Sequence, residues 1–167
     1  MNLFRRTALL ALFAAASPAV AQDVVRGSQA KIQFGYAAVE NSAYKQGIWM
    51  VGGSWRKAIT RHISLEPEFT YTGGGATVFG RKWNTPTSNG TMKLVVDRKG
   101  TRAVPYLTAG VGVSRSGNDL VPIAIVGGGW RIGLSRRVSV IPELRLSTPV
   151  FGGTTVFGIV GGLGYSF

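Results

Sequence analysis

The side chains best suited to covalent chemistry stand together in one short segment. His62 is the single histidine of the 167-residue chain, Ser64 follows two residues later, and Glu66 and Glu68 lie just beyond. In a strand, His62 and Ser64 would share one face because successive side chains alternate. A serine that a histidine activates and a carboxylate orients is an arrangement for acyl transfer. The segment is therefore a candidate hydrolase site.

A structural explanation of the same segment is simpler. His62 closes a short basic connection, Ala58–His62, and an internal repeat without gaps puts Arg137 and Ser139 at the positions of His62 and Ser64. A recurring turn accounts for this pattern without any reaction. We therefore predict no catalytic residue and keep the enzyme as an alternative.

Metal and cofactor chemistry finds little support in the sequence. The chain has one histidine and no cysteine, so the usual transition-metal ligands are missing. Its glycine runs, Gly73–Gly75 and Gly127–Gly129, lack the Gly-Lys-Ser/Thr ending of a phosphate-binding loop. We predict neither a metal nor a cofactor.

The N-terminus has the pattern of a secretory signal peptide. Arg5 and Arg6 precede a short apolar run, Ala8–Ala16, and Ala19-Val20-Ala21 forms a small-x-small cleavage site. We predict a signal peptide at residues 1–21 and a mature domain at 22–167. After the signal, no apolar run is long enough for a helix to span a membrane.

The composition is strongly basic, with 19 Lys and Arg against seven Asp and Glu. Removing the signal takes only two of the basic residues, so the mature chain keeps this excess. A secreted protein rarely meets nucleic acid, and the counter-charge we expect is lipid phosphate or lipopolysaccharide.

Beyond the signal the hydrophobic pattern has period two, which indicates strands. Eight segments show it, bounded to within a few residues: Ala30–Ala38, Gly47–Lys57, Ile63–Thr72, Thr91–Asp97, Ala103–Ser114, Pro122–Leu134, Val138–Ser147 and Val156–Phe167. Short basic connections alternate with connections that are longer on average, as in outer-membrane barrels. The short ones are Ala58–His62, Asp97–Arg102 and Ser135–Arg137, and the others are Val39–Gln46, Gly73–Gly90, Arg115–Val121 and Thr148–Thr155.

The internal repeat supports eight strands. When the chain is aligned with itself so that Trp55 falls on Trp130, eight identities appear without a gap between Gly52 and Glu68. Arg56 on Arg131 is one of them. This is consistent with a four-strand unit that is used twice.

Two closed barrels fit the alternation. A soluble periplasmic ligand-binding barrel would turn its apolar face inward, whereas a membrane barrel turns it toward lipid and encloses the polar face. We favour the membrane barrel because one face is apolar and the other is charged and glycine-rich. Aromatic residues also stand toward the strand ends, as a membrane-interface girdle requires: Trp55, Tyr71, Trp130 and Tyr165.

This orientation predicts an ionic lumen. Eight strands leave room for side chains to fill the interior. Charges buried there should pair, because an unpaired buried charge is costly. We expect a plugged barrel whose lumen holds Arg56, Glu66, Glu68, Lys93, Arg131, Glu143 and Arg145.

Several segments resemble the small outer-membrane β-barrel family that includes OmpA/OmpX-like and porin-family barrels. The resemblance covers most of the mature chain, and its motifs describe barrel construction rather than activity. The segments that resemble the family are Gly127–Leu134, Val138–Val140, Pro142–Arg145, Pro105–Gly112 and Gly162–Phe167. It implies an eight-stranded antiparallel up-and-down barrel in the cell outer membrane. It also implies that the assembly machinery of that membrane reads the closing strand, which ends in the aromatic residue Phe167.

The histidine segment resembles a second group. Lipid A deacylases of the PagL type, which are also eight-stranded barrels, use a His-x-Ser pair with a carboxylate. The Asn-rich surroundings of their motif are missing here, which leaves His62 and Ser64 as the weaker hypothesis.

The sequence thus predicts a non-enzymatic, monomeric surface or envelope barrel. We expect its extracellular loops to contact lipopolysaccharide phosphates or a protein partner, because they combine charge with a large aromatic side chain. The candidate contacts are Lys45, Arg81, Lys82, Trp83 and Arg115.

Overall fold

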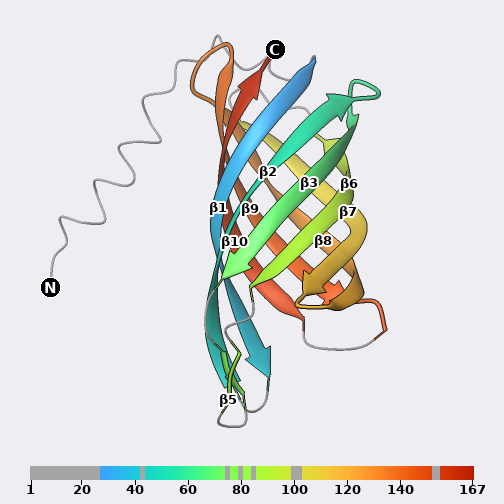
Figure 1. Cartoon of the computed structure of the whole chain (residues 1–167). Helices are drawn as coiled ribbons and strands as arrows, with labels where there is room; N and C mark the ends of the chain where they lie inside the picture. The colour runs from blue at the N-terminus through green and yellow to red at the C-terminus, as the bar shows by residue number, and fades with distance from the viewer. Residues whose placement is uncertain are drawn as a thin grey trace, which may run out of the picture.

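The computed structural model describes residues 27–41, 44–73, 76–78, 81–83, 86–98, 103–151 and 155–167. Eight of its strands close into one antiparallel barrel (Figure 1). They are β1 (Ser28–Asn41), β2 (Tyr44–Ala58), β3 (Ile63–Gly73), β6 (Thr87–Asp97), β7 (Ala103–Ser116), β8 (Asp119–Gly133), β9 (Val138–Pro149) and β10 (Val156–Ser166). Two short strands, β4 (Ala76–Val78) and β5 (Arg81–Trp83), form a separate hairpin between β3 and β6. The predicted eight-stranded barrel is confirmed, and the expected signal peptide at residues 1–21 lies outside the described residues.

The barrel closes between its first and last strands. β1 pairs with β2 on one side and with β10 on the other, from Gln29 opposite Ser166 to Val39 opposite Val156. Figure 1 shows β1 in blue beside β10 in red. Every barrel strand therefore has two hydrogen-bonded neighbours. Within the described residues, no helix is long and apolar enough to span a membrane.

The alternation of side chains decides which face meets lipid. In β3, Ser64, Glu66 and Glu68 are buried while Leu65 and Phe69 are exposed. The same pattern holds in β10, where Gly158, Gly162 and Gly164 face inward and Ile159 and Leu163 face outward. Apolar side chains thus cover the outside and charged ones fill the inside, as in a membrane barrel. This excludes the alternative of a soluble barrel with an apolar interior.

The two ends of the barrel differ. The start of β1, the end of β10 and the connections after β2, β6 and β8 lie at one end, which we call the turn end. The connections after β1, β3, β7 and β9, with the β4–β5 hairpin, lie at the other, which we call the loop end (Figure 1).

The loop-end connections are shorter than predicted. Lys45 lies in β2, paired with Glu40, and Arg115 lies in β7, paired with Leu120. The expected loop Arg115–Val121 is a tight hairpin in which Gly117 takes a φ of 60°. The predicted strands end where polar residues begin. The observed strand pairing continues past the apolar band, because the pairing needs only backbone N–H and C=O groups.

The expected loop Gly73–Gly90 is also partly strand. β3 extends to Gly73, β6 begins at Thr87, and β5 contains Arg81, Lys82 and Trp83. These three residues, like Lys45, are described in backbone position only.

The internal repeat is visible in the strand register. Lys31 lies opposite Ser54 between β1 and β2, and the equivalent pair in the second copy is Tyr106 opposite Gly129, between β7 and β8. Glu68 opposite Ser54 likewise becomes Glu143 opposite Gly129, between β9 and β8. Three consecutive strands therefore repeat in register. The fourth does not keep the spacing of the repeat, because the β4–β5 hairpin lengthens the connection before β6.

Aromatic side chains mark both ends of the apolar band. At the turn end, the Phe167 ring lies 5.1 Å from that of Trp55 and 5.2 Å from that of Tyr165. At the loop end, Trp49 and Tyr71 lie 5.8 Å apart. Such belts form where a protein crosses the interface between hydrocarbon and water.

A charge placed on the outer face should cost more at mid-height than at an end. Leu144 is outward-facing near the middle of β9, and Leu120 is outward-facing beside the Gly117 turn. We expect Leu144→Arg to lower the free energy of unfolding by about 2–4 kcal/mol and Leu120→Arg by about 0–1 kcal/mol. Denaturant unfolding in lipid vesicles measures both. Equal losses would contradict the assignment of the outer face to lipid.

Candidate functional site: ionic groups inside the barrel

The seven residues predicted for the lumen all lie inside the barrel. They come from β2, β3, β6, β8 and β9, and none exposes more than 6% of its surface. Alternation brings them inward because their outward neighbours are apolar. They form two groups at different heights in the barrel. Arg56 and Arg131 lie near the turn end, and the other five lie farther inside: Glu66, Glu68, Lys93, Glu143 and Arg145.

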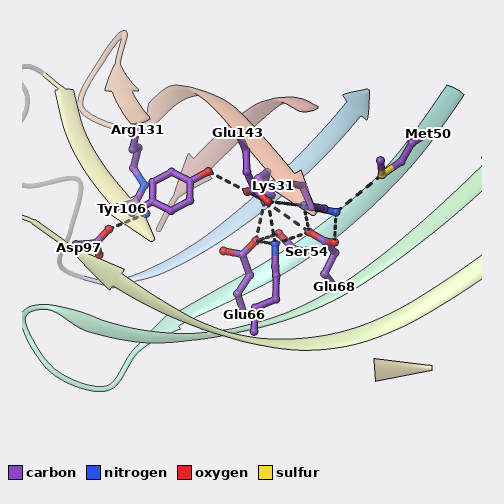
Figure 2. A network of polar contacts seen from close by, with 11 residues as sticks. Lys31, Met50, Ser54, Glu66, Glu68, Asp97, Tyr106, Arg131 and Glu143 are labelled. Atoms are coloured by element: carbon purple, nitrogen blue, oxygen red, sulfur yellow. Dashed lines mark hydrogen bonds and ion pairs between the residues drawn. The ribbon is translucent and has the colours of Figure 1, made fainter. Parts of the chain in front are cut away.

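The inner group, which we call the central cluster, joins Lys31 to the last five of these residues. Lys93 is fully buried, and its Nζ lies 2.6 Å from Glu68 and 3.2 Å from Glu66. Arg145 binds Glu68 at 2.6 Å and Glu143 at 2.7 Å. Ion pairs thus cross the lumen between facing strands (Figure 2).

Lys31 completes the central cluster, although it was not among the residues predicted for the lumen. Its Nζ lies 2.7 Å from Glu66 and 3.7 Å from both Glu68 and Glu143. The signal was available, because alternation in the first strand puts Lys31 on the face opposite Ile32 and Phe34.

The second group, which we call the arginine–tyrosine group, contains Arg56, Asp97, Tyr106 and Arg131. Asp97 accepts from Arg56 at 2.5 Å and from Arg131 at 3.5 Å. Both guanidinium carbons lie 5.9 Å from the centre of the Tyr106 ring, which is within range of cation–π attraction. The Tyr106 hydroxyl donates to Glu143 at 2.9 Å and so links the two groups (Figure 2).

Asp97 and Tyr106 were also absent from the predicted lumen set. The sequence puts Asp97 on the polar face of its strand, but its position beside a basic connection made it look like a turn residue. Alternation in β7 puts Tyr106 on the face of Thr108, opposite the outward-facing Leu107 and Val111, so the signal for its inward orientation was also available.

The two repeats differ inside the lumen in a compensating way. Arg56 and Arg131 occupy equivalent positions and share Asp97. Where the first repeat has Lys31, Ser54 and Glu66, the second has Tyr106, Gly129 and Ile141. A lysine–glutamate ion pair with a serine hydroxyl is thus exchanged for an aromatic side chain, a glycine and an aliphatic side chain.

Gly129 is required by the close approach of β9. It lies opposite Tyr106 on β7, and a Cβ at this position would collide with the carbonyl oxygen of Pro142 on β9. The equivalent residue, Ser54, instead donates a 2.8 Å hydrogen bond to Glu66. The two equivalent positions therefore differ in what they contact, a hydroxyl bonded to Glu66 in one repeat and a bare backbone against β9 in the other.

The charges of the two groups nearly cancel. They comprise five cations, Lys31, Arg56, Lys93, Arg131 and Arg145, and four carboxylates, Glu66, Glu68, Asp97 and Glu143. These four are more than half of the seven acidic residues of the chain. Because a buried charge is tolerated only when it is paired, the scarce acids are concentrated where they neutralise buried cations.

Between the central cluster and the loop end lies a cavity of about 240 Å³. Arg145 lines it together with side chains from all eight barrel strands. One part of its wall is apolar, formed by Ala37, Ile48, Met50 and Val156. The part on β3, β6 and β7 carries hydroxyl and amide groups, formed by Thr70, Thr72, Thr87, Asn89 and Ser114.

The candidate hydrolase residues do not come together. His62 lies in the connection before β3 and is exposed, whereas Ser64 faces the lumen and is 3% exposed. No hydrogen bond joins their side chains within the described residues, and Glu66 and Glu68 are engaged by lysines and Arg145. His62 and Ser64 do not share a strand face, because the strand begins at Ile63, as predicted. In the same described part, no group of three His, Cys, Asp or Glu residues could hold a metal ion.

The sequence from residue 7 to residue 167 matches the family described as outer membrane protein beta-barrel domain. The chain belongs to this family. Its place is therefore the cell outer membrane, in agreement with the outward apolar face. No curated protein matches the chain.

Solved structures of outer-membrane barrels have the same fold. Neisserial surface protein A superimposes with a TM-score of 0.72 at 12% identity, covering 84% of this chain and 97% of that one. The N-terminal barrel of Pseudomonas aeruginosa OprF gives 0.56 at 14% identity, covering 81% and 97%. Yersinia pestis Ail, solved with the heparin analogue sucrose octasulfate, gives 0.55 at 16% identity, covering 84% and 97%. At these identities the likeness concerns the fold alone.

Removing one carboxylate from the central cluster should destabilise the barrel. Glu68→Gln leaves Lys93 and Arg145 without their closest anion, and breaking such a buried pair costs about 3 kcal/mol. The control is Asp119→Asn, which removes an exposed carboxylate from the β7–β8 hairpin and should cost less than about 0.5 kcal/mol. Denaturant unfolding in micelles measures both, and equal effects would contradict a stabilising role for the cluster.

Proposed function

We propose that this protein is a non-enzymatic outer-membrane barrel whose lumen is plugged and whose loop end contacts anionic groups of the cell envelope or surface. The observation that carries the proposal is the pairing of charged side chains across the lumen. The loop end faces the cell exterior in this proposal, because outer-membrane barrels have short periplasmic turns and longer extracellular loops.

The plug is supported by the two ionic groups. A hydrated ion that crossed the barrel would have to displace contacts of 2.6 to 2.7 Å between Arg145 and its two glutamates. It would then meet Arg56, Asp97 and Tyr106 nearer the turn end. An eight-stranded barrel has little room beside such side chains.

A conductance measurement tests the plug. In planar bilayers we expect no stable conductance steps for the natural sequence. Arg145→Ser with Glu68→Ser should open a water path and produce steps, because it removes one ion pair from the middle of the lumen. The control pair Arg115→Ser with Asp119→Ser changes the same kinds of charge in the β7–β8 hairpin and should stay closed. Stable steps in the natural protein would contradict the proposal.

Contact through the loop end is supported by charge and position. Arg81, Lys82 and Trp83 lie in β5, which belongs to the hairpin outside the closed barrel, and Arg115 is exposed near the end of β7. Ail, which has a similar fold, was solved with a polysulfated ligand. Lipopolysaccharide phosphates are the polyanion that a barrel meets in this membrane. A protein partner is the second candidate.

The lipid A deacylase remains the enzymatic alternative, and its support is weak. An exposed His62 and a lumen-facing Ser64 cannot act together on a lipid at the outer face. Their segment also lies at the turn end, away from lipid A in the outer leaflet.

One assay tests both ideas. Arg81→Gln with Lys82→Gln and Trp83→Ala should weaken lipopolysaccharide binding at least tenfold while the barrel stays folded, as heat-modifiable gel migration shows. Replacement of residues 74–86 by a short Gly-Ser turn, which spares β3 and β6, should do the same. Unchanged binding would exclude the hairpin as the contact, and capture of a protein instead would favour the second candidate. Release of a fatty acid from lipid A that is lost in His62→Ala would establish the enzyme.

A further inference from the structure

Exposed cations surround the turn end of the barrel. Lys57 lies near the end of β2 on its outward face, Arg61 and Arg98 follow β2 and β6, and Arg136 and Arg137 follow β8, and all five are exposed. The Asp97 carboxylate lies at the same end, at the close of β6, but it is buried and held by Arg56 and Arg131. Within the described residues, none of the five exposed cations forms an ion pair with an Asp or Glu side chain.

Two of these connections are copies of each other. Ile59-Thr60-Arg61 and Leu134-Ser135-Arg136 are related by the internal repeat. In each, the first two backbone N–H groups donate to one carbonyl, that of Ile63 or of Val138, at 2.9 to 3.1 Å. We call residues 59–62 and 134–137 the twin turns.

Each twin turn combines a positive charge with an exposed apolar side chain. Ile59 and Leu134 are each 58% exposed, and they stand two residues before Arg61 and Arg136. An apolar side chain next to a cation suits the boundary between hydrocarbon and headgroups better than it suits water. A soluble polyanion would make no favourable contact with the exposed apolar side chains of Ile59 and Leu134.

The aromatic girdle sets the depth of these turns. Trp55 and Trp130 stand four residues before Ile59 and Leu134, so both turns begin just beyond the girdle. Arg137 donates a 3.1 Å hydrogen bond to the Tyr165 hydroxyl, and the Tyr165 ring packs against Phe167. The Arg137 guanidinium thus lies on the outer circumference of the barrel rather than over the mouth of the lumen. This is the level at which lipid phosphates are expected.

We propose that the twin turns, with Lys57 beside the first of them, are two equivalent binding sites for the phosphate headgroups of anionic phospholipids in the periplasmic leaflet. The apolar residue enters the acyl region and the arginine contacts phosphate. Bound lipid phosphates would supply a counter-charge to these exposed cations. The sites lie at the opposite end from the loop contacts proposed above, so either can fail without the other.

Electron spin resonance of spin-labelled lipids tests this on the full-length folded protein in bilayers. The measured quantity is the association constant of phosphatidylglycerol relative to that of phosphatidylcholine. We expect a several-fold preference for phosphatidylglycerol. It should fall to unity when four cations are neutralised together: Lys57→Gln, Arg61→Gln, Arg136→Gln and Arg137→Gln. Heat-modifiable migration shows that this variant is folded.

A matched variant controls for total charge. Lys45→Gln, Arg81→Gln, Lys82→Gln and Arg115→Gln remove the same number of cations at the loop end and should leave most of the preference. Loss of the preference in this control to the same extent would overturn the proposal. So would equal association of both lipids with the natural protein. Displacement of phosphatidylglycerol by inorganic phosphate, but not by chloride at equal ionic strength, would assign the sites to free phosphate instead.

Discussion

The constraint on which the whole structure depends is that hydrocarbon offers no partner for a backbone N–H or C=O group. A strand edge left open in lipid would expose a row of such groups at several kcal/mol each. The pairing of β1 with β10 removes this edge and makes a closed cylinder. Closure then gives every strand an inside and an outside, so each side chain must suit either lipid or a narrow lumen.

The lumen resolves a second conflict, between burial and charge. Lys93 is fully buried and would be strongly destabilising alone, yet it lies between Glu66 and Glu68, which also bind Lys31 and Arg145. Networks of this kind are tolerated because each ion has several partners. The chain has far fewer acidic than basic residues, and most of its carboxylates lie in the lumen, where they neutralise the buried cations. The cost is that none of the exposed cations at the turn end forms an ion pair with an Asp or Glu side chain among the described residues.

The repeat shows how one strand unit can serve two environments. Its outer features, a tryptophan, an apolar turn residue and an arginine, are kept in both copies, because both copies meet the same membrane interface. Its inner features have diverged, since the two copies face each other across one lumen. At the positions of Lys31, Ser54 and Glu66 the second copy has Tyr106, Gly129 and Ile141, so the lysine–glutamate pair occurs in one copy only. Arg56 and Arg131 stay equivalent because one carboxylate, Asp97, serves both.

The sequence by itself determined the eight strands of the barrel, the faces of those strands and seven of the nine charged residues of the lumen. These follow from period-two alternation, and alternation is a local property that each strand carries in its own residues. It also determined the repeat, because a shift without gaps needs no structure to be seen. The strand ends at Lys45 and Arg115 were wrong, since backbone pairing does not stop where polarity begins.

Only the tertiary structure decided which charges meet. That Lys31 joins Glu66, that Arg56 and Arg131 share Asp97, and that Tyr106 reaches Glu143 depend on residues far apart in the chain. Their contacts are set by the stagger of neighbouring strands around the cylinder. A register shift that kept every side chain on its face would still change every partner, so no pattern within a single strand can specify them.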